Sequence, residues 1–232
     1  MTDNLPDLSG MRSYFESGDT LFYEFRKKQV LTFRNAIKKY EHAISEALYT
    51  DLKKSPEEAY ATETGLLLVE ISGTLKNLHK WMTPKKVSTD LLNFPSDSKI
   101  YHEPLGVVLI IAPWNFPLQL LLIPLVGAIA GGNCAVIKPS ELAPATSALI
   151  RRIISEIFSE NYIQVVEGDG SQIIPEMING FQFDHIFYTG STHAGKIIYQ
   201  LAAKNLVPVT LELGGKSPCL VEPDANIKVA AR

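Results

Sequence analysis

The fold is decided by residues 106–138, which read GVVLIIAPWNFPLQLLLIPLVGAIAGGNCAVIK. The apolar, β-branched run at 107–112 is typical of a strand, and the prolines and asparagine that follow it break that pattern. A nearly uncharged helical segment comes next and stops at Gly131-Gly132-Asn133, after which 135–138 is again strand-like. The stretch therefore predicts a strand, a turn, a helix and a second strand, with the strands buried on both faces.

Part of this stretch, residues 118–137, also resembles a membrane-spanning helix because it is nearly uncharged. Pro124, Gly127 and the Gly131-Gly132-Asn133 break interrupt it. These breakers, and the length of each uninterrupted piece, favour a buried helix followed by a buried strand over a membrane span.

Outward from this unit, the same two kinds of element alternate to residue 213. Strand-like runs are expected at 107–112, 135–138, 163–166, 185–189 and 208–213. Helices are expected at 118–130, 144–158, 172–178 and 194–203. Alternation of apolar strands with helices predicts an α/β fold, a doubly wound parallel sheet with right-handed connections.

The first third of the chain is predicted to be helical. One face is formed by apolar residues repeating at three- and four-residue steps, namely Val30, Phe33, Ile37, Tyr40, Ile44 and Leu48. Ser55-Pro56 begins a further helix, with Ser55 as its cap, that is expected to reach about His79 or Trp81. Residues 83–101 are polar and contain two prolines, which indicates an extended arm or hairpin.

The unusual polar and glycine-rich segments each follow a predicted strand. They lie at 113–117, 138–141, 167–170, 188–191 and 212–216. Because ligands of open α/β sheets bind outside the carboxyl ends of the strands, these segments predict one crevice for a large polar ligand. The turn at Gly190–Gly195 suits a phosphate at a helix N-terminus, although it matches no established phosphate motif and a plain glycine-rich turn is the alternative.

Composition excludes several other classes of function. The formal net charge of −3 argues against nucleic acid as a partner. The 2 cysteines are too few for a disulfide framework or a zinc site, so a reducing compartment, the cytoplasm, is expected. The first residues carry no pattern of a secretory signal.

Four motifs, in this order, resemble the aldehyde dehydrogenase superfamily, and most closely its class-three and fatty-aldehyde branch. They are PWNFP at 113–117, KPSE at 138–141, TGS at 189–191 and LELGGKSP at 211–218. The resemblance implies NAD(P)-dependent oxidation of an aldehyde to a carboxylic acid through a cysteine thioester. It also implies a helical part at 1–82, an oligomerisation arm at 83–103, a Rossmann-like NAD(P)-binding domain at 104–210 and the beginning of a catalytic domain at 211–232.

Two catalytic roles follow from the resemblance. Asn115 is implied to donate from its side-chain amide to the oxyanion of the reacting aldehyde, against the alternative of an asparagine that only caps a turn. Glu212 is implied to be the general base for the hydrolytic water, and we expect it to be partly desolvated at the end of an apolar strand. The alternative for Glu212 is a structural carboxylate that binds the Gly214 and Gly215 amides.

The resemblance also implies a cofactor site. Lys138 and Glu141 would contact the adenosine ribose, where a carboxylate favours NAD over NADP, with NADP use as the alternative. Glu141 could instead belong only to the turn before the next helix. The remaining implied contacts are Gly190, Ser191 and Gly195 at the pyrophosphate, Gly168 near the adenosine, and Ser140, Leu213 and Gly214.

Neither cysteine stands where this family places its nucleophile, which comes a few tens of residues after Glu212. We expect Cys134 and Cys219 to be buried, structural residues, and the chain to stop before the nucleophile and be inactive alone. Apolar surface near 213–221 should then be exposed. The full enzyme is expected to be a homodimer. The alternatives are a non-catalytic NAD-binding module and a partner that docks on a relative through the arm.

Overall fold

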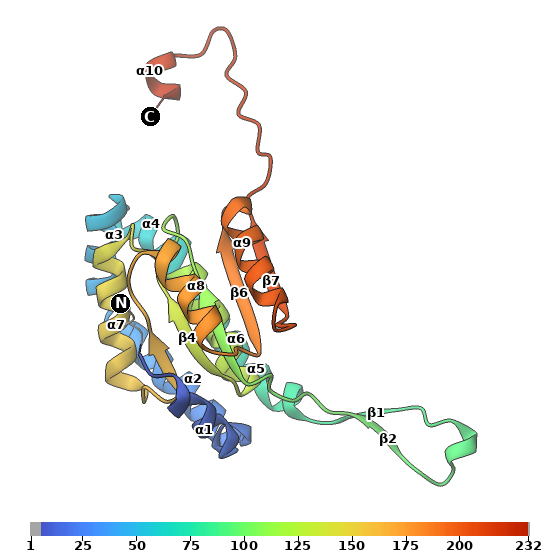
Figure 1. Cartoon of the computed structure of the whole chain (residues 1–232). Coiled ribbons are helices and arrows are strands. Elements are labelled where there is room, and N and C mark those ends of the chain that lie inside the picture. Colours follow the sequence, from blue (N-terminus) through green and yellow to red (C-terminus); the bar gives the residue numbers. More distant parts are fainter. Residues whose placement is uncertain (1–5, 232) are drawn as a thin grey trace.

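Five parallel strands form the central sheet of the computed structural model, which describes residues 6–231 (Figure 1). They are β3 (Val107–Ile111), β4 (Cys134–Lys138), β5 (Ile163–Val165), β6 (His185–Gly190) and β7 (Val209–Leu213), in the order β5-β4-β3-β6-β7. Each strand begins and ends within one residue of its predicted bounds. Every residue of β3 and β4 is buried, as expected for strands covered on both faces.

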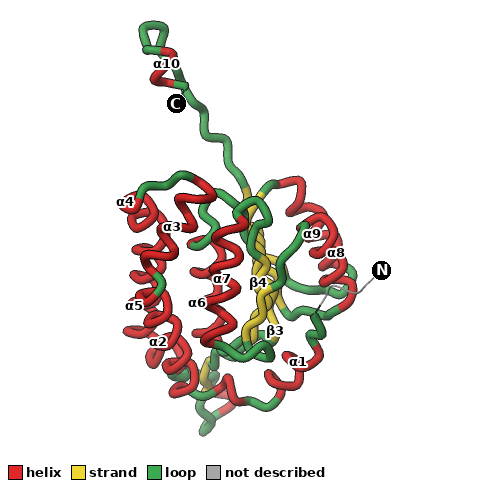
Figure 2. The backbone as a smooth tube through the Cα atoms, turned by 90° about the vertical axis from the view of Figure 1, so that its left-hand side faces the viewer, coloured by secondary structure: helices red, strands yellow, loops and turns green. Residues whose placement is uncertain are grey.

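Four helices connect these strands and cover both faces of the sheet. They are α6 (Gln119–Gly131), α7 (Pro144–Ile157), α8 (Gly170–Gly180) and α9 (Thr192–Ala203). Figure 2 shows α6 and α7 on one face and α8 and α9 on the other. The predicted doubly wound α/β fold is therefore confirmed.

The direction in which strands are added reverses at β3. From β3 the chain adds β4 and β5 on one side, then crosses the sheet and adds β6 and β7 on the other side. Such a reversal leaves the loops after β3 and β6 diverging to opposite faces, which opens a crevice at the carboxyl edge of the sheet. A ligand site is therefore expected at the carboxyl edge of the sheet, between β3 and β6.

A second helical layer packs outside α6 and α7 (Figure 2). The helices before the sheet are α1 (Ser9–Glu16), α2 (Tyr23–Lys39), α3 (Glu41–Leu52), α4 (Pro56–Ala59) and α5 (Gly65–Met82), with a 3-10 turn η1 (Asp19–Leu21) and a π-helical turn η2 (Tyr60–Thr64). The apolar face predicted from Val30 to Leu48 is buried throughout, although the helix is divided between α2 and α3 at Tyr40. Ser55 caps the next helix by accepting a hydrogen bond from the Glu58 amide (3.2 Å), as predicted.

The arm is an antiparallel hairpin that projects from the body of the protein (Figure 1). Its strands are β1 (Lys85–Val87) and β2 (Ser98–Ile100), with a 3-10 turn η3 (Leu91–Asn93) between them. Leu91, Leu92 and Phe94 near its tip are almost fully exposed. The hairpin predicted for 83–101 is confirmed.

The apolar stretch at 118–137 forms α6 and β4, both of which pack inside the protein, so the choice of a buried helix and strand is confirmed. Within residues 6–231, no helix is long and apolar enough to cross a membrane.

Beyond β7, residues 214–226 leave the sheet and lead to the short helix α10 (Ile227–Ala230), away from the body of the protein (Figure 1). Leu213, Leu220 and Val221 are exposed, so the exposed apolar surface predicted near 213–221 is confirmed. Cys219 is also exposed, and its predicted burial is wrong. The prediction failed because no neighbouring strand or helix among the described residues covers this apolar run.

Candidate active site

A pocket of about 590 Å³ lies where the strand order reverses. Its walls are Pro113–Asn115 after β3, one side of α6, the end of β6 with Ser191, and Glu212–Gly214 at the end of β7. Six of the residues predicted for the site therefore line a single pocket: Asn115, Gly190, Ser191, Glu212, Leu213 and Gly214. The crevice predicted from the strand ends is present.

Asn115 is exposed at this pocket, in the loop of residues 113–117 between β3 and α6. Its main-chain carbonyl accepts a hydrogen bond from Lys54 Nζ (2.9 Å), a residue 61 positions earlier in the chain. Trp114 lines the same pocket and is half-exposed. A side-chain amide on an anchored loop beside an open pocket can donate to an oxygen atom bound there.

Glu212 stands on β7, opposite Thr189 of β6 in the parallel register, and its side chain is exposed. The partial desolvation predicted for this carboxylate is therefore wrong for this chain. The prediction relied on the flanking leucines, but β7 is the edge strand of the described sheet and the residues after it lead away.

The turn between β6 and α9 carries Ser191 and Gly195. Ser191 caps α9, because its hydroxyl accepts a hydrogen bond from the Ala194 amide (3.2 Å). A Cβ atom at residue 195 would lie 2.8 Å from Leu213 Cδ2, so glycine allows α9 to pack closely on the end of β7. Ser191, at the amino end of α9, lines the pocket, and the dipole of this helix favours an anion there.

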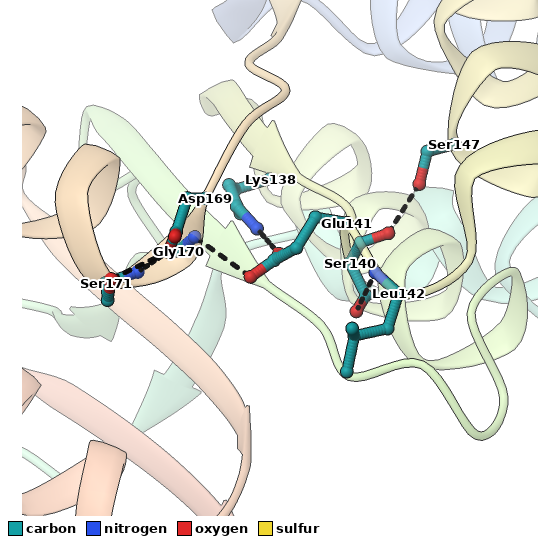
Figure 3. A network of polar contacts seen from close by, with 8 residues as sticks. All are labelled: Lys138, Ser140, Glu141, Leu142, Ser147, Asp169, Gly170 and Ser171. Atoms are coloured by element: carbon teal, nitrogen blue, oxygen red, sulfur yellow. Dashed lines mark hydrogen bonds and ion pairs between the residues drawn. The ribbon is translucent and has the colours of Figure 1, made fainter.

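A second group of predicted residues lies along the same edge, after β4 and β5 (Figure 3). The Lys138 ammonium is buried, and it forms an ion pair and a hydrogen bond with the Glu141 carboxylate. The other carboxylate oxygen of Glu141 accepts a hydrogen bond from the Gly170 amide (3.0 Å), at the start of α8. Partial burial alone would raise the pKa of Glu141, but Lys138 and the Gly170 amide outweigh it and hold that pKa below its ordinary value.

Ser140 is buried, and its hydroxyl accepts from the Leu142 amide (3.3 Å) while its carbonyl accepts from the Ser147 hydroxyl (2.8 Å). These bonds shape the turn that carries Glu141, and a contact from Ser140 to a ligand stays a prediction. Gly168 has a φ of 136°, a conformation that side chains rarely adopt, and a Cβ there would lie 2.1 Å from Ile173 Cδ1. Glycine is therefore required at 168 by the fold itself.

Asn115, Lys138, Gly190 and Glu212 follow or end neighbouring strands, so all four lie along one edge of the sheet. The structure brings them together, as the sequence predicted.

Cys134 begins β4, at the end of the strand opposite Lys138 and away from the pocket. Burial raises the pKa of its thiol to about 12, which disfavours the reactive thiolate. Its predicted structural role is supported, whereas Cys219 is a free, exposed thiol. Among the residues that the structure describes, no group of metal-ligating side chains could hold an ion.

Two residues near the site escaped the sequence analysis, Lys54 and Glu63, which contact the loop of Asn115 from the helical layer. A signal for Glu63 exists. Glu63 lies four residues from both Ala59 and Leu67, on the buried helix face that continues to Ile71. An apolar side chain is expected at such a position, so a glutamate there is unusual.

Comparison with known proteins gives one consistent result. The family model described as "Aldehyde dehydrogenase family" matches residues 11–232. A 4,4'-diaponeurosporen-aldehyde dehydrogenase from Staphylococcus aureus is 52% identical over 220 residues, which are 95% of this chain and 48% of that protein. An aldehyde dehydrogenase family 3 member I1 from Arabidopsis thaliana is 45% identical over 224 residues, 96% of this chain and 40% of that protein.

Solved structures agree. A betaine aldehyde dehydrogenase from Staphylococcus aureus, in complex with NAD+, superposes with a TM-score of 0.81 at 31% identity, over 96% of this chain and 44% of that one. The chain thus spans about half the length, or less, of the relatives that it matches.

Proposed function

The chain belongs to the aldehyde dehydrogenase family, and we propose that it carries the cofactor site and two catalytic side chains of an NAD-dependent enzyme that oxidises an aldehyde to a carboxylic acid. The observation that carries this proposal is the pocket at the strand reversal, which gathers Asn115, Gly190, Ser191 and Glu212 beside the Lys138–Glu141 pair. These residues lie at or just after the carboxyl ends of four neighbouring strands, β3, β4, β6 and β7.

In the proposed reaction a thiolate adds to the aldehyde carbonyl, and the carbonyl oxygen becomes an oxyanion. Asn115 donates its side-chain amide to that oxygen, a contact that is stronger in the transition state than in the bound aldehyde. After the adduct carbon has given up its hydride to form a thioester, Glu212 accepts a proton from the water that attacks this thioester, and the thiolate leaves as the carboxylic acid forms. Its exposed position leaves Glu212 accessible to water in this chain.

The residues along the sheet edge fit a dinucleotide. Lys138 and Glu141 offer a donor and an acceptor for ribose hydroxyls, and the amino end of α9 with the side-chain-free Gly190 and Gly214 suits a pyrophosphate. When bound, NAD would accept the hydride from the aldehyde carbon. This fit supports the cofactor assignment, and the NAD+ complex of the relative is consistent with it.

We propose NAD rather than NADP as the preferred cofactor. The Glu141 carboxylate opposes a 2′-phosphate, but the adjacent Lys138 ammonium offsets part of that repulsion. The preference is therefore expected to be moderate.

The nucleophilic thiol is proposed to belong to the part of the relatives that this chain does not cover. Cys134 is buried at the far end of β4, and Cys219 lies on the extended segment after β7. The arm is proposed to pair two copies of the protein, since its apolar tip is exposed.

Two measurements test the proposal. Calorimetry with the purified chain should give saturable NAD binding. A chimera, made by joining the chain to the part of the Staphylococcus aureus relative that it does not cover, should form NADH from an aldehyde, whereas the chain alone should not. NAD binding without NADH formation by the chimera would favour a non-catalytic NAD-binding module. Absence of NAD binding would contradict the cofactor site itself.

A further inference from the structure

A buried ion pair lies beneath the loop that carries Asn115. Lys54 Nζ is 2.6 Å from Glu63 Oε1, and the two side chains are 8% and 0% exposed. Lys54 follows α3, and Glu63 lies on the π-helical turn η2 between α4 and α5. Turns of this kind are rare and occur often at functional sites.

Lys54 contacts the middle of the loop, at Asn115 and Phe116. Its ammonium donates to the Asn115 carbonyl (2.9 Å) and lies 4.1 Å from the centroid of the Phe116 ring. The buried Lys54 ammonium therefore interacts with three groups: the Glu63 carboxylate, the Asn115 carbonyl and the face of the Phe116 ring. These contacts fix the main chain at the residue whose side chain reaches the pocket.

Glu63 contacts the two residues that follow the loop, at the start of α6. Its Oε2 accepts hydrogen bonds from the Leu118 amide (2.8 Å) and the Gln119 amide (3.2 Å). These amides open α6, which has no cap from a local side chain. A carboxylate from a separate helix thus takes the place of the cap, where the dipole of α6 favours a negative charge.

We propose that Lys54 and Glu63 are positioning residues, which hold the 113–117 loop at Asn115 and at its junction with α6 so that the Asn115 amide is presented to the pocket in one orientation. A buried ion pair is a weak source of net stability, whereas its directional bonds can define a geometry. The pair touches the loop by its main chain and does not line the pocket. The catalytic consequence rests on the proposed function, and the loop geometry does not.

The test separates positioning from stability. In the double variant Lys54→Met with Glu63→Leu, both charges are removed together and neither is left buried and unpaired. The melting temperature should therefore fall by only about 2–4 °C, the loss expected for one helix cap. Hydrogen exchange at the Leu118 and Gln119 amides should rise about ten-fold or more, because their acceptor is lost. NMR relaxation of the Asn115 side-chain amide should show greater mobility.

The control is Arg12→Met, at a less buried ion pair near the amino end of β3. Arg12 Nη1 lies 2.7 Å from Asp184 Oδ2, which also accepts from the Val107 amide (2.6 Å). This variant should lower the melting temperature without selective exchange at Leu118 and Gln119. If the double variant and the control change exchange in the same way, or the double variant changes neither exchange nor Asn115 mobility, the proposal is overturned. Should the double variant not fold, Lys54→Met removes only the bond to the Asn115 carbonyl and should raise the mobility of the Asn115 side chain while exchange at Leu118 and Gln119 stays low. Unchanged Asn115 mobility in this variant would overturn the proposal.

The chimera adds a catalytic readout. The double variant should lower kcat about 10- to 100-fold, because a misplaced oxyanion donor loses much of its effect, with the KM for NAD unchanged. If the double variant loosens the 113–117 loop but kcat of the chimera does not change, the orientation of Asn115 does not matter for catalysis and this part of the proposal is overturned. A wild-type chimera without any aldehyde oxidation would instead contradict the proposed function, while the exchange measurement would still decide the positioning role.

Discussion

The two sides of the carboxyl edge of the sheet are organised differently. After β4 and β5, Glu141 binds both Lys138 and the Gly170 amide, and Lys138 is 2% exposed. After β7, Glu212 is exposed and the chain leads away from the sheet. The proposed cofactor side is therefore formed by contacts within this chain. The proposed catalytic carboxylate, Glu212, has no such contacts among the residues that the structure describes, and its burial depends on what packs against the residues after β7.

The largest expected effect is at Glu212. Glu212→Gln in the chimera should lower the rate of NADH formation at saturating substrate by about 100-fold or more, because a general base is lost. NAD affinity of the chain should not change measurably by calorimetry. A parallel loss of both quantities would show that the two sides are not independent.

Lys138 is expected to have the reverse effect. Lys138→Ala should weaken NAD binding about 10- to 100-fold, since a charged donor is removed and Glu141 loses its partner. Calorimetry of the chain measures this directly. Lys196→Ala, on α9 away from the Lys138–Glu141 pair, is the matched loss of one positive charge and should have a much smaller effect. Equal losses in the two variants would assign the effect to net charge.

Gly168 tests whether the fold determines the cofactor side. Gly168→Ala should lower the free energy of unfolding by about 1–2 kcal/mol, because alanine rarely adopts its backbone conformation and would crowd Ile173. Chemical denaturation gives the value. Gly180→Ala, at the end of α8, has free space around it and should be neutral or slightly stabilising. A stable Gly168→Ala chain would contradict the strained geometry.

The smallest effect concerns the charge of Glu141. Its pKa is lower in the folded than in the unfolded chain, so its ionisation contributes stability above the ordinary value of 4.5, which is lost as pH falls through the folded value. The stability difference between the wild type and Glu141→Gln should therefore shrink as pH falls below about 4.5. Denaturation at a series of pH values would show parallel profiles if Lys138 and Gly170 did not stabilise the carboxylate.

Sequence patterns predicted the sheet closely because apolar runs and turn residues determine strands and their ends locally. The convergence of Asn115, Gly190 and Glu212 was predictable for a related reason, since parallel strands place all their carboxyl ends on one edge. The patterns could not locate the partners of Glu63, because the amides that it binds lie 55 and 56 positions later in the chain.

The sequence patterns also failed to predict that Glu212 and Cys219 are exposed. The leucines beside Glu212 and the apolar run after Cys219 look like core residues in the sequence. Burial, however, depends on what lies opposite, and among the described residues β7 pairs only with β6.

The bond between Arg12 and Asp184 joins residues 172 positions apart. During synthesis at about 5–20 residues per second, the first helix must wait on the order of 10 to 30 s before its carboxylate partner has been made. The strand β3 is complete well before then, and its neighbour β6 is made last of the two strands that flank it. From the completion of β3 at residue 111 until β6 begins at residue 185, roughly 4–15 s at that rate, one edge of this apolar strand stays unpaired in the nascent chain, and a chaperone could bind there.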